Sequence, residues 1–454
     1  MQLILSNYGL CLFQTKEKLH KPTGGRFQDP LLKTLSDLYD QKVSPWRELP
    51  HQKELIKHGW AQQAPDDMSA SSIRLRYKRN PLEHVKRLVF EYTTLCQLNC
   101  LHCRNGHTKP TNTRRVDLLK EAVDLMLPLD IKRFDFIGGE VTLYGRGWLD
   151  VVEHISRHKG ALTAVITSGW FLEETNFMAA SVRYKNDLEY LRVLKERGLT
   201  HVIFSVDGPE EVHDYWRQFP GLYQRILRGI PKVREAGLEP KVSVVLSDAI
   251  DQRELSMCHL ALANALYAFE KDIPERDRIQ FLLADDMNYV SNFIDIGNGV
   301  DMGEKKSFRY EEMPDNLLRC KNFFRPFPSL RIQANGELSL CPLIDAGEGY
   351  GNVSEQGFLH VLNHLQDAFT YKLHAENQIV DYRKYLDLSL FGPNVGHICS
   401  LRTVLTLLAK EIESSGIDPE KDLETLRRLN LEVASRSGFL PASGKTATGV
   451  KRPV

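Results

Sequence analysis

Three cysteines close together in the sequence carry the chemistry that this chain most clearly offers. They are Cys96, Cys100 and Cys103, and they follow directly after the strand-like run 88–92. Thiols at this spacing can bind three corners of a cubic iron–sulfur cluster and leave the fourth iron without a protein ligand. Such an open iron can bind a substrate or cofactor and reduce it directly. The spacing therefore predicts a reactive metal centre.

Two other uses of these cysteines stay open on the sequence alone. One is a zinc site, although zinc ligands favour cysteine pairs separated by two residues, with a second pair elsewhere. The other is a set of buried structural thiols, although three in eight residues is dense for a chain with eight cysteines in 454 residues. The cluster is favoured because further motifs follow it in order.

The segment that must position these cysteines alternates between strand-like and helical runs, which is typical of βα units in a parallel sheet. The strands are predicted at 88–92, 133–137, 162–166, 201–206, 241–246 and 279–283, and the helices near 116–127, 147–158, 185–197, 221–236 and 251–269. We therefore expect an α/β fold, an open partial (β/α)6 TIM-like barrel, over residues 85–300. An open sheet would admit a bulky substrate beside a cofactor.

The ends of these strands carry the remaining motifs. Gly138-Gly139-Glu140 follows the second strand, Ser168 ends the third, and Ser205 and Asp207 end the fourth. Together with the cysteines, these motifs resemble the radical S-adenosylmethionine (SAM) superfamily. Without the cysteines, the two glycines would be read as a tight turn. For His213, Asp214 and Arg217, a structural network of ion pairs and helix capping is the alternative.

The resemblance implies how cofactors are held. The three cysteines would bind a [4Fe-4S] cluster, with the amine and carboxylate of SAM on its open iron. An anionic Glu140 suits the ammonium group, and the fork of Arg217 suits a carboxylate. Asp207 is the expected catalytic residue, because it would hold substrate or take a proton. The implied cofactor-binding residues are His102, Gly138, Gly139, Glu140, Ser168, Ser205, Arg217 and Val244.

A second group of cysteines follows the barrel. Cys320, Cys341 and Cys399 lie around a predicted hairpin at 330–340, whose Asn-Gly pair is a strong turn signal. This arrangement is similar to the SPASM and twitch domains, which implies one auxiliary iron–sulfur cluster in residues 301–410. These domains often end with two cysteines separated by two residues, but Arg402 stands where the second would follow Cys399. The alternative is that the three cysteines are unrelated buried thiols.

The two ends of the chain complete the predicted organisation. Residues 1–80 are expected to form a hairpin from 3–5 and 10–13, then two helices and a strand near 73–77. This order resembles the winged-helix peptide-recognition element of peptide maturases, and a cap on the barrel is the alternative. Residues 411–454 are expected to form a polar helix and a flexible tail.

The composition limits the partners and the compartment. Lysine plus arginine and aspartate plus glutamate both number 59, so the net charge is zero and gives no electrostatic argument for nucleic acid or a membrane surface. No apolar stretch is long enough to span a bilayer, and unevenly spaced cysteines favour metal chemistry over disulfides. We expect a cytoplasmic protein.

These observations lead to one preferred function and two alternatives. A radical SAM enzyme would generate a 5′-deoxyadenosyl radical and modify a ribosomally synthesised precursor peptide, by cross-linking, oxidation or epimerisation. An external one-electron donor such as flavodoxin or ferredoxin would reduce the cluster. The alternatives are a radical SAM dehydrogenase or rearrangement enzyme that acts on a small metabolite, and a non-catalytic iron–sulfur or zinc protein.

Overall fold

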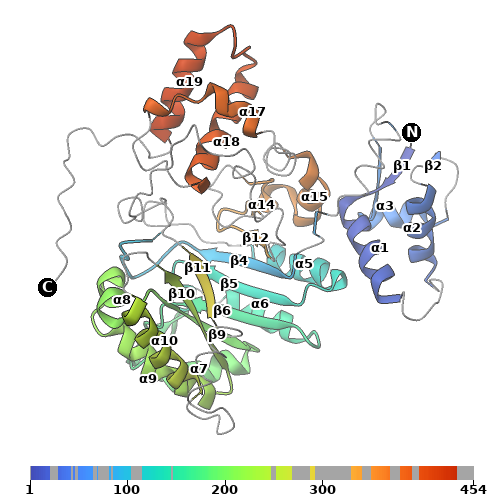
Figure 1. Ribbon diagram of the computed structural model, residues 1–454. Helices are drawn as coiled ribbons and strands as arrows, with labels where there is room; N and C mark the ends of the chain where they lie inside the picture. Colours follow the sequence, from blue (N-terminus) through green and yellow to red (C-terminus); the bar gives the residue numbers. More distant parts are fainter. Residues whose placement is uncertain are drawn as a thin grey trace.

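The fold was obtained as a computed structural model. The structure describes residues 2–20, 29–41, 44–45, 50–64, 69, 81–82, 85–103, 115–144, 147–246, 252–267, 287–291, 329–339, 349–368, 379–390 and 398–436. Its helices and strands form a central sheet, a small N-terminal unit and a group of C-terminal helices (Figure 1).

The central sheet confirms the predicted open barrel. Six neighbouring strands run parallel in the order β11-β10-β9-β6-β5-β4. They are β4 (Arg87–Thr93), β5 (Arg133–Gly138), β6 (Leu162–Thr167), β9 (His201–Val206), β10 (Glu239–Leu246) and β11 (Met287–Ser291). The sixth parallel strand is therefore at 287–291, and the strand predicted at 279–283 lies outside the described residues.

The helices that cover this sheet follow the predicted order. They are α5 (Val116–Met126), α6 (Gly147–Ser156), α7 (Asp187–Glu196), α9 (Leu222–Glu235) and α10 (Gln252–Tyr267). Each of the first four buries apolar residues along one side, as expected of amphipathic helices in βα units. The helix α8 (Glu210–Arg217) and the antiparallel pair β7 (Thr175–Ala179) and β8 (Val182–Asn186) were not predicted.

The predicted hairpin at 330–340 belongs to this same sheet. Strand β12 (Ser329–Ile332) pairs in parallel with β4 and turns at Gly336, with φ +89°, into β13 (Leu338–Ser339). A buried ion pair of 2.8 Å between Arg331 Nη2 and Glu91 Oε1 joins β12 to β4. The sheet therefore continues past residue 300, into the region assigned from the sequence to a separate auxiliary domain.

The N-terminal unit corrects one prediction. Residues 10–13 are not a strand, because Ser6 Oγ accepts a hydrogen bond of 2.9 Å from the Gly9 backbone and caps the helix α1 (Asn7–His20). The predicted helices are present as α2 (Pro30–Gln41) and α3 (Gln52–Lys57). Strands β1 (Gln2–Leu5), β2 (Ser44–Pro45) and β3 (Ala61–Gln63) form an antiparallel sheet in the order β2-β1-β3. The strand predicted near 73–77 lies outside the described residues.

The C-terminal elements are mostly helical. They are α14 (Val353–Gln356), α15 (Phe358–Asn363), α17 (Ile379–Tyr382), α18 (Ile398–Ser415) and α19 (Leu423–Arg436). Helices α18 and α19 share a hydrophobic cluster of their own, which includes Val404, Leu408 and Val433. Within the described part of the chain, no helix is long and apolar enough to cross a membrane.

One asparagine ties the N-terminal unit to these C-terminal elements. Asn363 Oδ1 accepts a hydrogen bond of 2.9 Å from the Tyr8 backbone, and Asn363 Nδ2 donates one of 3.1 Å to the Gly59 carbonyl. In return, Asn7 Nδ2 donates to the carbonyls of Leu362 and Asn363. These four hydrogen bonds join the N-terminal unit to α15.

Candidate active site

The three cysteines lie on the loop that leaves the carboxyl end of β4. Cys100 is buried, and Cys96 and Cys103 are partly exposed. Burial raises the pKa of Cys96 to about 12 and that of Cys100 to about 11, although Arg217 opposes the second shift. Both thiols therefore keep their protons until a metal displaces them.

The turn of Gly138 and Gly139 lies directly against this loop. The Gly139 backbone donates 2.6 Å to the Thr93 carbonyl, and the Glu140 backbone donates 2.7 Å to the Leu95 carbonyl. A Cβ atom on Gly138 would lie 1.9 Å from Thr93 O, and one on Gly139 would lie 2.0 Å from Leu95 O. The glycines thus let two protein loops meet, whereas the sequence suggested only that they let a ligand approach.

Glu140 has a buried carboxylate that is held by hydroxyl groups. Its Oε1 accepts bonds from Thr142 Oγ1 at 2.6 Å and Thr167 Oγ1 at 2.8 Å. Its Oε2 accepts from Ser168 Oγ at 2.6 Å and from the Ser168 backbone at 2.9 Å. Ser168 was predicted at the site and orients Glu140 there. The sequence analysis missed Thr142 and Thr167, although both carry hydroxyls next to predicted motif residues.

Asp207 and Arg217 form the second charged part of the site. Arg217 donates from Nε to Asp207 Oδ2 at 2.5 Å and from Nη2 to Oδ1 at 2.9 Å. His102 Nε2 lies 3.5 Å from Asp207 Oδ1, and His213 Nδ1 lies 3.6 Å from Oδ2. His213 Nδ1 also accepts a hydrogen bond from the Asp207 backbone. Two of the predicted residues, His102 and Arg217, thus meet at a third, Asp207.

The charges of this group change the role expected for Asp207. Burial opposes its ionisation, but Arg217, His102 and His213 outweigh burial and hold the pKa of Asp207 well below its usual range. A fully buried carboxylate with so low a pKa is a poor proton acceptor. The pairing therefore argues against a proton-accepting role, and Asp207 is better described as a residue that positions Arg217 and His102.

Helix α8 connects Arg217 to the cysteine loop. The Leu101 backbone donates 2.8 Å to the Trp216 carbonyl, and Arg217 Nη1 lies 4.0 Å from Cys100 Sγ. The His102 ring lies 5.9 Å from that of Trp216. Arg217 was predicted to bind a cofactor carboxylate. In the structure, the carboxylate of Asp207 already accepts hydrogen bonds from two of the Arg217 nitrogens.

The structure describes the remaining predicted site residues only in part. Ser205 is partly buried on β9, and its backbone pairs with Ser243 of β10. The backbone of Val244 pairs with Val206, but its side chain lies outside the described part. The side chains of Cys320, Cys341 and Cys399 also lie outside the described residues.

The donor set fits an iron–sulfur cluster better than a single zinc ion. Zn–S bonds of about 2.3 Å keep the sulfurs on one zinc within about 4.6 Å of each other. In the described part of the chain, the sulfurs of Cys96, Cys100 and Cys103 do not all lie within 4.8 Å of one another. Three thiols on one loop, with no fourth beside them among the described residues, suit a cubic cluster with one open iron.

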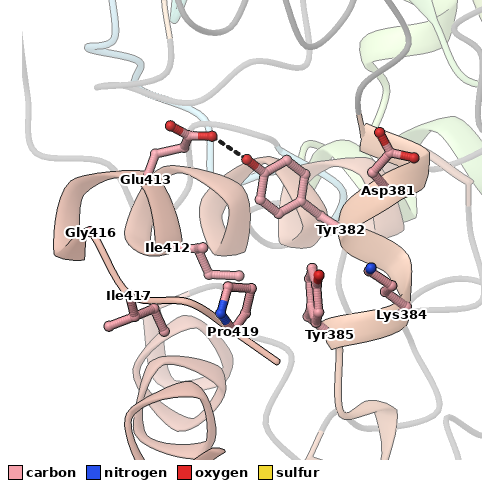
Figure 2. Close-up of a pocket in the computed structure, with 9 residues that line it drawn as sticks. All are labelled: Asp381, Tyr382, Lys384, Tyr385, Ile412, Glu413, Gly416, Ile417 and Pro419. Carbon is pink, nitrogen blue, oxygen red and sulfur yellow. Dashed lines mark hydrogen bonds between the residues drawn. The ribbon is translucent and has the colours of Figure 1, made fainter. Parts of the chain in front are cut away.

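A separate cavity of about 550 Å³ lies among the C-terminal helices (Figure 2). The Tyr382 hydroxyl donates to Glu413 there, and Lys384 lies over the Tyr385 ring at 4.6 Å. Burial, with Glu413 nearby, raises the pKa of Tyr382 well above its usual range. This cavity was not predicted, and its lining shares no residue with the cysteine loop.

The fold and the site together define an enzyme-like α/β barrel with a cysteine loop for a metal cofactor at the carboxyl ends of its strands. Residues 90–250 match the family model of the radical SAM superfamily. The central domain of this chain therefore belongs to that superfamily.

Two named relatives each match about a third of this chain. An AdoMet-dependent heme synthase of Nitratidesulfovibrio vulgaris is 26% identical over 167 residues, 36% of this chain and 41% of the relative. An Fe-coproporphyrin III synthase of Methanosarcina barkeri is 27% identical over 154 residues, 34% of this chain and 35% of the relative. The aligned part of this chain therefore covers only 41% and 35% of the length of these two relatives.

Solved structures match more of the chain at lower identity. SuiB of Streptococcus suis, bound to S-adenosylmethionine, gives a TM-score of 0.44 and 12% identity, over 79% of this chain and 77% of that protein. The enzyme anSMEcpe, with bound AdoMet and a peptide, gives a TM-score of 0.39 and 15% identity, over 63% of this chain and 81% of that one. Likeness at this level carries no argument about the substrate.

Proposed function

We propose that this protein is a SAM-cleaving radical enzyme that modifies a precursor peptide by C–H chemistry. The observation that carries the proposal is the meeting of the cysteine loop with Glu140 on one side and Arg217 on the other. When bound, a [4Fe-4S] cluster and SAM supply a 5′-deoxyadenosyl radical that removes hydrogen from an unactivated carbon.

The residues of the chain bind and orient these groups. Cys96, Cys100 and Cys103 would hold the cluster as thiolates. Arg217 lies near Cys100 and lowers the pKa of that thiol against the effect of burial, which favours the thiolate. Glu140 presents an oriented carboxylate that attracts the ammonium group of SAM, since four donors from Thr142, Thr167 and Ser168 fix its position.

A peptide substrate is supported by the N-terminal sheet. An extended peptide can add as a strand to the edge of such a sheet, and its backbone then supplies the hydrogen bonds. Among the strands that the structure describes, the two edges are β2 and β3. Pro45 on β2 has no N–H to offer, so β3 is the better acceptor edge. The Asn363 hydrogen bonds hold this unit to α15, and so would hold a bound peptide in one position relative to the rest of the chain.

A small organic molecule is the second candidate substrate. Relatives of this chain are named for heme synthesis and, in Archaeoglobus fulgidus, as a probable GTP 3′,8-cyclase, 23% identical over 173 residues. For a small substrate, the N-terminal sheet would only cap the barrel. Removal of residues 1–80 would then leave the turnover of free substrate intact.

Further parts of the proposal rest on the sequence. Cys320, Cys341 and Cys399 would hold one auxiliary cluster, and a small electron carrier such as flavodoxin or ferredoxin would reduce the site. The protein would act in the cytoplasm, where such carriers and reduced thiols are available.

Anaerobic reconstitution with iron and sulfide tests the catalytic part. The reduced protein should convert SAM to 5′-deoxyadenosine, measured by liquid chromatography and mass spectrometry. The variant Cys96→Ser/Cys100→Ser/Cys103→Ser should lose this product, whereas Cys11→Ala, which removes a buried thiol of α1, should keep it. No deoxyadenosine from the intact protein would refute the proposal. Leader peptides from neighbouring reading frames, titrated by fluorescence anisotropy, test the substrate.

A further inference from the structure

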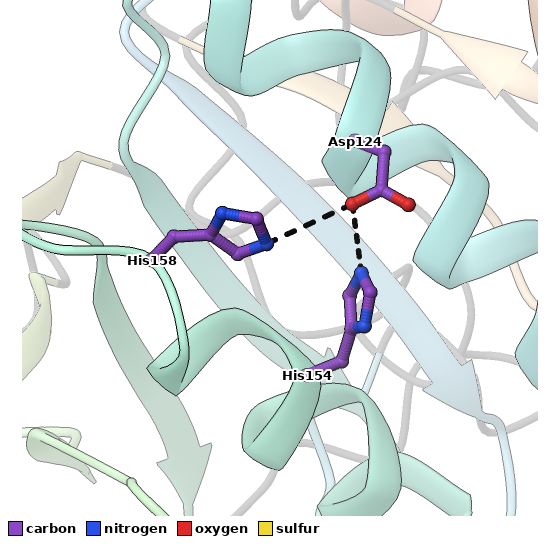
Figure 3. A group of neighbouring side chains, drawn as sticks. All are labelled: Asp124, His154 and His158. Carbon is purple, nitrogen blue, oxygen red and sulfur yellow. Dashed lines mark hydrogen bonds and ion pairs between the residues drawn. The ribbon is translucent and has the colours of Figure 1, made fainter.

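A group of metal-binding side chains lies on the outside of the barrel, between α5 and α6 (Figure 3). Asp124 Oδ1 of α5 lies 2.8 Å from His154 Nε2 and 3.8 Å from His158 Nε2. His154 is in the last turn of α6, and His158 follows four residues later in the turn that leaves it. One ligand atom from each of the three residues lies within 4.8 Å of the others.

We propose that Asp124, His154 and His158 bind a divalent transition-metal ion of the zinc type. Imidazole nitrogens and a carboxylate oxygen are preferred zinc ligands, and three protein ligands leave a fourth position for water. His154 in the last turn of α6 and His158 in the turn that leaves it both bring Nε2 toward the same carboxylate oxygen of Asp124. The side chains are partly exposed, between 21% and 54%, so small rotations can bring the donor atoms to bonding distance.

The surrounding charges leave these ligands available. The nearby cation Arg157 pairs with Glu153, and Arg197 pairs with Asp150 and Glu153. Asp124 itself faces the two histidines. A simple ion pair between Asp124 and a protonated histidine would need only His154. Here the Nε2 atoms of both His154 and His158 converge on Asp124 Oδ1, which suits a metal ion that all three residues share.

The position of the site indicates what bound metal would do. Asp124 lies near the end of α5 and His154 near the end of α6, just ahead of β5 and β6 respectively. This is the amino-end edge of the parallel strands, and the cysteine loop leaves the opposite edge. In βα barrels, catalysis is at the carboxyl end, and features at the amino end serve stability. The metal would therefore fasten α5 to α6 and raise the stability of the fold.

Zinc titration of the reconstituted holoenzyme tests the site, because bound clusters occupy the thiols that would otherwise compete. Isothermal titration with ZnCl2 should show one saturable event, and the melting temperature should rise with zinc concentration by mass action. The variants Asp124→Asn and His154→Ala/His158→Ala should each raise the Kd by about tenfold or more. Circular dichroism without zinc checks that both variants fold.

A matched histidine pair serves as the control. His360 and His364 are also four residues apart on exposed helix surface, with stacked rings 4.2 Å apart, but they form no such group with a carboxylate among the described residues. The variant His360→Ala/His364→Ala should leave zinc binding unchanged. X-ray absorption should show nitrogen and oxygen neighbours at about 2.0–2.2 Å. A sulfur shell at about 2.3 Å, or equal zinc affinity in the Asp124 and His154/His158 variants, would overturn the proposal.

Discussion

Arg217 donates hydrogen bonds from Nε and Nη2 to the Asp207 carboxylate, and its Nη1 lies 4.0 Å from the Sγ of Cys100. Both charges are almost completely removed from solvent, since their side chains are 12% and 0% exposed. The bidentate geometry is the strong form of an arginine–carboxylate contact. The pair therefore fixes the end of α8 beside the cysteine loop before any cofactor binds.

Arg217→Ala should destabilise the protein strongly. The substitution leaves the buried Asp207 carboxylate without its main partner, which typically costs about 3–5 kcal/mol. Chemical unfolding of the cluster-free chain measures this loss. Arg192 pairs with Glu235 on the surface, where both side chains are more than half exposed, so Arg192→Ala should cost less than about 1 kcal/mol. Similar losses in the two variants would contradict the role assigned to Arg217.

His213 should make the stability depend on pH. Burial lowers its pKa to about 3, against an ordinary value of 6.5, although Asp207 opposes the shift. The unfolded chain therefore takes up the proton first as the pH falls. The contribution of His213 is fully present above pH 6.5 and is lost as the pH falls toward 3, by at most about 1.4 kcal/mol per pH unit.

The variant His213→Asn isolates this effect, because an amide oxygen can still accept the hydrogen bond from the Asp207 backbone. The free energy of unfolding of the cluster-free chain, measured between pH 5 and 7, should fall less steeply in the variant than in the parent. Parallel curves would show that His213 titrates normally in the folded protein.

The sheet was predictable because its strands carry continuous apolar runs, and β9 has the bounds 201–206 that the sequence predicts. The failure at residues 10–13 has a local cause. Asn7 and Gly9 favour a tight turn, but the hydroxyl of Ser6 caps the first turn of a helix with the same residues. The helix also buries residues 10–13 in the core, a tertiary contact that the local turn signal does not report.

The site was predictable at the level of strand ends and not at the level of side-chain partners. Parallel topology alone brings Cys100, Glu140 and Asp207 to one edge. The pairing of Arg217 with Asp207 depends on the direction of α8, which no sequence period reports. Likewise, the spacing of His154 and His158 can be read from the sequence, but the approach of Asp124 from another helix cannot.

Gly139→Ala should disturb the cysteine loop. The new methyl group would lie 2.0 Å from the Leu95 carbonyl oxygen, which is backbone and cannot move aside cheaply. The loop would shift, and iron bound after reconstitution should fall well below that of the parent. Gly160 has φ +79° but open space around it, so Gly160→Ala should cost about 1 kcal/mol from backbone strain and keep the iron. Full iron content in Gly139→Ala would contradict the proposed contact.

The triple variant Cys320→Ala/Cys341→Ala/Cys399→Ala should lose about half of the iron bound by the reconstituted protein. One auxiliary cluster carries as many irons as the cluster on the cysteine loop, if both contain four. Iron analysis should show the loss of the auxiliary cluster. The production of 5′-deoxyadenosine should continue, because the cluster on the cysteine loop stays in place. Retention of all the iron would show that these cysteines are ordinary thiols.

Asn363→Ala should release the N-terminal unit. The substitution leaves the buried Tyr8 N–H without its partner, which costs about 1–3 kcal/mol, and removes one of the two donors to the Gly59 carbonyl, which still accepts a hydrogen bond from Ser6 Oγ. Hydrogen exchange should then accelerate at residues 6–10 and 59–63, where the hydrogen bonds of the interface lie. If the N-terminal sheet receives the substrate peptide, peptide modification should fall while SAM cleavage without peptide stays constant.

Asn430 provides the matched control for this prediction. It is also buried, and its side chain makes three hydrogen bonds, to the backbone of Tyr385, Leu426 and Asp387, but these bonds lie within the C-terminal elements. Asn430→Ala should accelerate exchange in α17 to α19 and leave residues 6–10 unchanged. Equal acceleration of residues 6–10 in both variants would mean that Asn363 acts through general stability, because a specific interface responds only to the residue that forms it.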